Sequence, residues 1–357
     1  MLEPVDYFPV LKNYCEAVIK PNLQIEVQNY GYSGNNGTIT LPNSFSAYEQ
    51  TEYFYKGVNK FIHFTSFENL SHIINSNYFI ASQLSSLDDP LELIFAGHDL
   101  MEVITEKQLH ELKKYLFSFS MCEYNQNSDS YNMWNMYGKN GYGIGIVFSF
   151  YDNIKKWNGS FLSNVHYGRD NSCLDKFKNI SQAHNSFTKE HPEITMLSNI
   201  GGINGITDDV ALLLSFHKSH LYLEENEVRY LKSFLHNSHE TSLRNDSMGV
   251  RINKKHKVEE FYKLPIVSKK NIDDLCNKTD QQKINNFQTE FIYNKNIIST
   301  VVDNNPFVIL ETIILGYRYT DKELETIKKG KIKIIEKLNS GLIEFQLSNV
   351  SKEFYGK

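Results

Sequence analysis

The chain has 357 residues, of which 41% are hydrophobic, and it carries a formal net charge of -5 with a pI of about 6.2. This length allows one large domain or two smaller ones, and the apolar content excludes a chain that is disordered throughout. The charge provides no general attraction to nucleic acid or to an anionic membrane surface. The N-terminus has no signal pattern and no apolar run is long enough to span a bilayer, so we expect a cytoplasmic protein with no membrane segment.

The N-terminal half contains several helix and strand signals. Residues 1–55 form an extension in which segments 25–31 and 38–41 are expected to pair as strands. A buried strand over 59–64 precedes a helix capped by Thr65 and Glu68, and a second short strand covers 78–82. A turn at Pro90 then leads into helices over 91–103 and 106–115, the second capped by Thr105 and Gln108.

The second half of the chain predicts further strands, interrupted by polar insertions near 169–208 and 268–300. Strands are expected at 116–122, 143–150 and 163–168, and a helix over 209–219 leads into a strand that carries Glu227. One or two strands follow between 250 and 266. Near the C-terminus, a strand over 306–316 precedes a helix from Thr320 to Lys329, and short strands are expected at 331–335 and 341–347.

One stretch, residues 133–150, combines aromatic side chains with closely spaced glycines. Trp134, Tyr137 and Tyr142 flank the turn that contains Gly141 and Gly143. These residues either form an aromatic core beside a tight turn, or stack on a planar ligand that the glycines allow to approach the backbone. The spacing does not match a dinucleotide fingerprint, because it leads into a strand and lacks the G-x-G-x-x-G pattern.

Two other segments carry side chains that suit chemistry. His63 ends an apolar strand, where it is either a core histidine bonded to backbone or a donor that holds a polar ligand. Glu225, Glu227 and Arg229 alternate, so a strand would place them on one face. They form either a surface ion pair, or a fixed negative charge that stabilises an oxocarbenium-like sugar while Arg229 holds a carboxylate or a phosphate.

Metal chemistry is not expected. The acidic cluster of Asp88, Asp89 and Glu92 is explained by a turn and the start of a helix, and no His or Cys lies beside it. The four cysteines, at positions 15, 122, 173 and 276, show no short spacing. This pattern argues against a structural zinc site or a disulfide scaffold and is typical of a reducing compartment.

In its motifs the chain resembles the DUF2971 family of mostly uncharacterised prokaryotic proteins. The matching pieces run in the family's order over residues 56–335: HFTSFENLSHII, SLDDPLE, FSFSMC, MWNMYGKNGYGIGIVF, the Glu225-x-Glu227-x-Arg229 element and IILGYRYTDKELETIK. The resemblance implies a domain over 56–357 that follows the extension at 1–55.

The same elements are similar, more distantly, to the ADP-ribosyltransferase superfamily. YGIGIVF is similar to a G-x-G-I-Y-F segment of the poly-ADP-ribosyl branch, although Val147 replaces its second Tyr, and NEVRYL is similar to its Asn-Glu strand. The resemblance implies an α+β fold with a split, mixed β-sheet core flanked by helices. It also implies that His63 bonds the ribose of NAD, that Tyr137 or Tyr142 stacks on nicotinamide, and that Glu227 stabilises the ribose cation. Glu225 would assist the attack of an acceptor.

The expected function is therefore transfer of ADP-ribose from NAD to a protein or nucleic acid, or hydrolysis of NAD, in phage defence or a toxin-like system. Trp134, Gly143 and Arg229 complete the expected cofactor site. The alternative is a non-catalytic module of the same fold that senses a nucleotide or binds a partner protein, and a homo-oligomer is also possible. A metal-dependent nuclease is disfavoured by the acidic pI and by the lack of a recognisable metal cluster.

Overall fold

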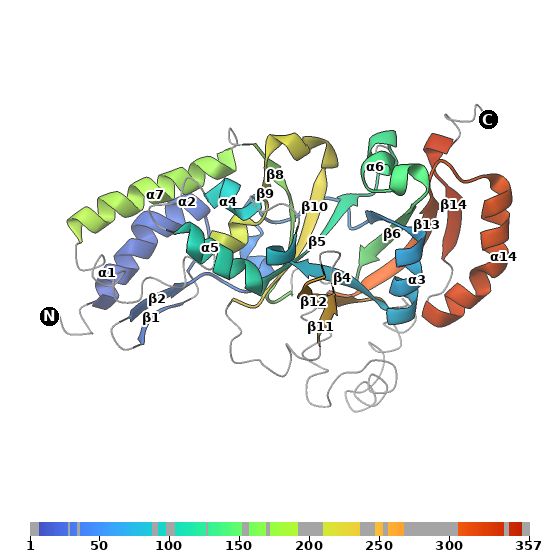
Figure 1. Cartoon of the computed structure of the whole chain (residues 1–357). Coiled ribbons are helices and arrows are strands. Elements are labelled where there is room, and N and C mark those ends of the chain that lie inside the picture. Colours follow the sequence, from blue (N-terminus) through green and yellow to red (C-terminus); the bar gives the residue numbers. More distant parts are fainter. Residues whose placement is uncertain are drawn as a thin grey trace.

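The computed structural model describes residues 7–27, 29–33, 36–87, 92–97, 104–125, 128–151, 157–168, 172–191, 210–235, 247–252, 256–267, 306–338 and 343–351 (Figure 1). The predicted turn at Pro90 and the insertion at 268–300 lie outside these residues, as does the stretch 192–208 of the other insertion. No helix among the described residues has the length and apolar character needed to cross a bilayer.

A ten-stranded mixed sheet forms the centre of the molecule, and helices flank it (Figure 1). The path along the sheet is β11 (Met248–Ile252), β12 (Val258–Pro265), β4 (Tyr78–Gln83), β5 (Leu116–Glu123), β3 (Phe61–Thr65), β6 (Ile144–Phe150), β13 (Val308–Leu315) and β14 (Glu344–Leu347). β13 and β14 run parallel, and the other described pairs in this sheet are antiparallel. The prediction of a mixed sheet with flanking helices is confirmed.

The sheet forks at β5. One edge of β5 pairs along its length with β10 (Glu227–Ser233), which in turn pairs with β7 (Ser160–Asn164). The other edge is shared, because β4 pairs with residues 117 and 118 whereas β3 pairs with residues 122 and 123. The stretch 119–121 therefore lies where β3 and β4 separate, and this opening in the ladder positions the site described below.

Helix starts follow local capping chemistry. α5 (Glu106–Leu112) begins with the predicted capping box of Thr105 and Gln108, and Thr320 and Glu323 form the same reciprocal bonds at α14 (Asp321–Leu338). The cap predicted for α3 (Phe67–Ser76) was wrong by one residue. Ser66 caps this helix by accepting from the Asn69 N–H at 3.2 Å, because Thr65 is still the last residue of β3.

Two further predictions of secondary structure were wrong. Residues 331–335, expected as a strand, continue α14, because a capped run of strong helix formers outweighs a short two-residue alternation. The helix expected over 209–219 ends at residue 214, after which β9 (His217–Lys218) pairs in parallel with β8 (His166–Tyr167). α4 (Glu92–Gly97) covers only part of the predicted segment 91–103, of which 98–103 lie outside the described residues.

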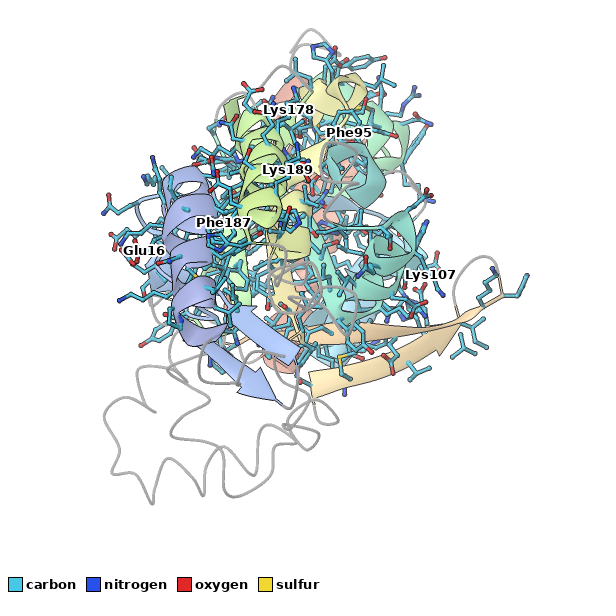
Figure 2. All side chains as sticks on the ribbon, turned by 90° about the vertical axis from the view of Figure 1, so that its left-hand side faces the viewer. Glu16, Phe95, Lys107, Lys178, Phe187 and Lys189 are labelled. Atoms are coloured by element: carbon cyan, nitrogen blue, oxygen red, sulfur yellow. The ribbon has the colours of Figure 1, made fainter. Side chains whose placement is uncertain are left out.

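The N-terminal extension packs on the helix of the first insertion. It contains α1 (Tyr7–Tyr14), a π-helical turn (Cys15–Ile19), α2 (Lys20–Leu23) and the hairpin of β1 (Asn29–Ser33) with β2 (Asn36–Thr40). α7 (Ser172–Glu190) lies against these helices (Figure 2). The Tyr14 hydroxyl bonds Nδ1 of His184 at 2.8 Å, and its ring meets Phe187 edge-on at 5.4 Å. Two segments outside the sheet thus stabilise each other.

Aromatic side chains dominate the core between the sheet and its covering elements. Phe148 contacts Phe61, Phe79 and Phe119 with ring centroids 5.4 to 6.0 Å apart. A second apolar cluster surrounds Trp134, which is fully buried beside Phe64, Val147 and Tyr317. This second cluster supports α6 (Tyr131–Met136), which forms one wall of the site.

Candidate functional site

A pocket of about 140 Å³ lies beside the fork in the sheet and collects four of the predicted site residues. His63 comes from β3, Tyr137 follows α6, and Glu225 and Glu227 stand at the entrance to β10. The other residues in the lining are Ile62, Phe64, Ser120, Met121, Cys122, Met133 and Lys218. The structure thus brings an imidazole, a phenol and two carboxylates from three distant parts of the chain into one hollow.

The two carboxylates of the pocket share one lysine. Lys218 Nζ lies 2.8 Å from Oε2 of Glu225 and 2.6 Å from Oε2 of Glu227. On the other side of Glu227, Nε of Arg229 lies 2.8 Å from Oε1 and Nη2 donates to Oε2 at 3.2 Å. All four side chains are at least 86% buried, so the group is a nearly dry cluster of two negative and two positive charges.

Glu227 remains ionised despite its burial. Desolvation alone would raise the pKa of its carboxyl, but the charges of Arg229 and Lys218 lower that pKa to about 2. The hydroxyl of Ser120 also donates to Oε1 at 2.5 Å, and the backbone N–H of Glu227 donates to the hydroxyl of Tyr167 at 2.9 Å. Its position is therefore fixed from four directions.

Glu225 reaches the pocket by a different route from the one predicted. It ends a 3-10 helix (His220–Glu225), and Asn226, with φ of 44°, makes a left-handed turn before β10 begins at Glu227. The expectation that the two glutamates alternate within a strand was wrong for Glu225. They converge because both carboxylates turn toward Lys218.

Tyr137 forms the outer wall. Its hydroxyl donates to Oε1 of Glu225, and 43% of the residue is exposed. Burial of the hydroxyl end and the neighbouring Glu225 charge raise the pKa of Tyr137, so the phenol stays protonated. The exposed ring leaves an aromatic surface at the mouth of the pocket.

His63 lies at the fork, where its Nδ1 is 3.0 Å from the carbonyl oxygen of Ser120. A carbonyl only accepts hydrogen bonds, so Nδ1 carries the proton and Nε2 is the acceptor in the neutral ring. Burial of the ring, which packs against Phe79 and Phe119 at 6.0 and 4.6 Å, lowers the pKa of His63. The site therefore holds a neutral imidazole with a defined tautomer.

The other four predicted ligand-binding residues do not reach the pocket. Trp134 is fully buried, donates from Nε1 to Asp129 at 2.6 Å and packs edge-on against Phe64. Tyr142 is 59% exposed and stacks with Arg318 at 5.1 Å. The backbone of Gly143 is crowded by protein, since an added Cβ would lie 2.5 Å from the carbonyl oxygen of Thr65.

Arg229 is 1% exposed and is held by Glu227 and by the carbonyl of Ser215, to which Nη1 donates. This agrees with the expectation that it holds a carboxylate, but that carboxylate belongs to the protein. The buried guanidinium is not placed to bind a phosphate.

Three residues of the site were not predicted. Lys218 carries the charge shared by both glutamates, Ser120 bonds His63 and Glu227, and Tyr167 supports the start of β10. The alternation of FSFSMC indicated that Ser118 and Ser120 share a face, which is the one signal that pointed to Ser120. Lys218 enters the site through the pairing of β8 with β9, which no local pattern indicated.

Two larger hollows adjoin the pocket. One, of about 700 Å³, shares His63 and Ser120 with it and extends between α3, β4 and the β11–β12 hairpin. The other, of about 480 Å³, shares Cys122, Met133, Glu225 and Glu227 and opens toward Asn164 and Tyr167. Within the described part of the chain, no three His, Cys, Asp or Glu side chains converge as metal ligands would.

Comparison with known proteins shows a family match over part of the chain. A family described as "Protein of unknown function (DUF2971)" matches residues 133–230, the portion that contains most of α6, the glycine-rich turn and the segment through Glu225, Glu227 and Arg229. No curated protein and no solved structure matches the chain significantly. The matched portion supplies Tyr137, Lys218 and both carboxylates of the pocket, whereas His63 lies before it.

Proposed function

We propose that the pocket binds NAD and breaks the bond between nicotinamide and ribose, so that ADP-ribose passes to a macromolecule or to water. The observation that carries the proposal is that His63, Tyr137, Glu225 and Glu227 line a single small hollow. Its volume of about 140 Å³ matches the size of cavity, about 150 Å³, that holds one six-membered ring. The adjoining space of about 700 Å³ lies in the range of pockets that hold drug-sized ligands and suits the remainder of a dinucleotide.

The charge arrangement suits departure of nicotinamide, which leaves NAD as a neutral molecule because its ring nitrogen takes the electron pair of the broken bond. As the glycosidic bond breaks, positive charge develops on the ribose, and fixed carboxylates in a dry site stabilise it. Glu225 and Glu227 are such carboxylates, held in place by Lys218. Nε2 of His63 is available to accept from a ribose hydroxyl, because Nδ1 is committed to Ser120. The exposed ring of Tyr137 offers a stacking surface at the mouth.

A specific observation favours a second candidate, a module that binds a nucleotide without cleaving it. Both oxygens of Glu227 already accept bonds, Oε1 from Ser120 and Arg229 and Oε2 from Lys218 and Arg229. A carboxylate so fully engaged is typical of a structural role. In that case Glu225, whose Oε1 faces the hydroxyl of the half-exposed Tyr137, forms the polar end of a binding site.

Release of nicotinamide from NAD by the purified chain, monitored by proton NMR, distinguishes the two candidates. The transferase or hydrolase predicts release by the wild type and a loss of about 100-fold or more in Glu227→Gln and in Glu225→Gln. A matched control is Glu325→Gln, because Glu325 is an exposed glutamate on α14 that pairs with Lys328 at 3.3 Å. This variant should retain wild-type turnover.

Because Glu227→Gln leaves buried positive charges, a charge-balanced Glu227→Gln/Lys218→Met variant with a native circular-dichroism spectrum provides a second test. Turnover that survives in this folded variant would contradict the enzymatic proposal. Binding of NAD without any release of nicotinamide, in the wild type and in Glu227→Gln alike, would support the non-catalytic module.

A further inference from the structure

Glu225 and Glu227 also line a second cavity, which lies beside the small pocket. This hollow of about 480 Å³ shares Glu225 and Glu227 with the small pocket, so the two glutamates form a wall between the two spaces. Apart from that wall, its lining is largely polar and includes Glu123 and Glu224. A polar cavity next to these two carboxylates could hold a second ligand.

The cavity carries surplus negative charge. Glu225 and Glu227 are balanced by Lys218 and Arg229, which lie outside the lining. Glu123 accepts a bond from the hydroxyl of Tyr55 at 2.5 Å, and Glu224 accepts one from Nδ2 of Asn132 at 3.3 Å. These last two partners are neutral, and the described lining residues include no Lys or Arg, so no cation in the described lining balances the charges of Glu123 and Glu224.

An apolar rim borders the same site. Met136 on α6 and Leu221 and Leu223 on the 3-10 helix before β10 are 48%, 88% and 47% exposed. Both segments lie on the upper side of the molecule in Figure 1, and the bonds from Asn132 to Glu224 and from Tyr137 to Glu225 join them. Solitary exposed apolar residues are common, but a group beside a charged cavity is typical of a protein-binding surface.

From these two observations we infer that the cavity receives the Arg or Lys side chain of a protein segment whose flanking apolar residues lie on the rim. The carboxylates of Glu123 and Glu224 complement such a cation through charge-assisted hydrogen bonds. A nucleic acid would instead bring phosphates toward uncompensated carboxylates, which disfavours it. The inference deepens the proposed function and rests on it in one respect, namely that the bound segment would be the acceptor of ADP-ribose.

The test is a direct binding measurement in the absence of NAD. The probes are a fluorescein-labelled Gly-Leu-Arg-Leu-Gly peptide, the same peptide with neutral citrulline in place of arginine, and a labelled oligo-thymidine. Fluorescence anisotropy should show binding of the arginine peptide to the wild type, with affinity at least about tenfold lower for the citrulline peptide and for the oligo-thymidine.

Variants separate the contribution of charge from that of the rim. Glu123→Gln/Glu224→Gln should weaken the arginine peptide about tenfold and leave the citrulline peptide unchanged, whereas Leu221→Ser/Leu223→Ser should weaken both. The control Val58→Ser changes an apolar residue that is 62% exposed and lies outside the rim and the cavity, and should bind like the wild type. All the variants should keep the native circular-dichroism spectrum.

Equal binding of the two peptides, no binding of the arginine peptide, or preferential binding of the oligo-thymidine would overturn the inference. Because NAD is absent, these outcomes are independent of nicotinamide release. Peptide binding without turnover would leave a protein-docking module, and turnover without peptide binding would leave the proposed enzyme with another acceptor or with water.

Discussion

Replacing Glu227 with Gln should destabilise the fold strongly, apart from any effect on activity. The carboxylate is 3% exposed and lies between Arg229 and Lys218, which are 1% and 14% exposed. Gln preserves the shape but removes the negative charge, so two buried cations lose their counter-charge. Breaking a buried pair in this way costs about 3–5 kcal/mol.

The shifted pKa gives a similar magnitude. A pKa of about 2 in the folded state, against an ordinary value of 4.5, corresponds to about 3 kcal/mol of stability. Since the folded pKa of Glu227 is lowered, this contribution is fully present above about pH 4.5 and is lost as the pH falls toward 2. At neutral pH the whole of it should therefore be measurable.

The assay is urea unfolding at neutral pH, monitored by tryptophan fluorescence. Glu325→Gln, which breaks the exposed pair with Lys328, should change the free energy of unfolding by less than about 0.5 kcal/mol. Glu227→Gln/Arg229→Gln should cost less than the sum of the two single variants by about 1–3 kcal/mol, because the partners are in contact. A Glu227→Gln variant as stable as Glu325→Gln, or strict additivity in the double variant, would refute the reasoning.

Three further outcomes are expected. Asp129→Ala should lower the free energy of unfolding by about 2–4 kcal/mol, because this buried carboxylate accepts hydrogen bonds from Trp134, Ser348 and Asn349. Urea unfolding measures this loss, and a value below about 1 kcal/mol would contradict the prediction. Burial lowers the pKa of His63, His166 and His217, so below about pH 6.5 the unfolded chain binds more protons than the folded chain and the free energy of unfolding should fall. Thermal melts between pH 7.5 and 5.5 should show this loss, and a melting temperature that stays constant over that range would contradict it. Gly143→Ala should lower the free energy of unfolding by about 1–3 kcal/mol, because the added Cβ would collide with backbone atoms. Gly330→Ala in α14 should raise it by about 0.5–1 kcal/mol, because the added Cβ meets open space and alanine favours a helix. Urea midpoints that shift in the same direction in both variants would contradict this contrast.

Local patterns in the sequence predicted much of the secondary structure. Reciprocal side-chain bonds made the starts of α5 and α14 readable from the residues alone, because a capping box involves only neighbours in the chain. The errors at Thr65 and at residues 331–335 arose where two local signals competed and the extent of a neighbouring element decided between them. The fork at β5 depends on long-range pairing, which no local signal encodes.

The candidate site was predictable only in its most distinctive members. His63, Tyr137, Glu225 and Glu227 stood out as polar or aromatic side chains at the ends of apolar segments, and they lie in one pocket. Their roles in catalysis stay predictions. The sequence offered no means of separating Trp134, an aromatic residue required by the core, from one that lines a ligand site. Lys218 was missed because a lone lysine after an apolar helix is normally a surface residue.

The bonds of Asp129 also constrain when the site can form during synthesis. Ser348 and Asn349 bond the same carboxylate that holds the indole of Trp134 beneath α6, the helix that leads to Tyr137. A nascent chain still attached to the ribosome with residue 348 inside the exit tunnel lacks those two bonds. The pocket should therefore mature only after residues 348 and 349 have left the tunnel, because α6 lacks this support until then.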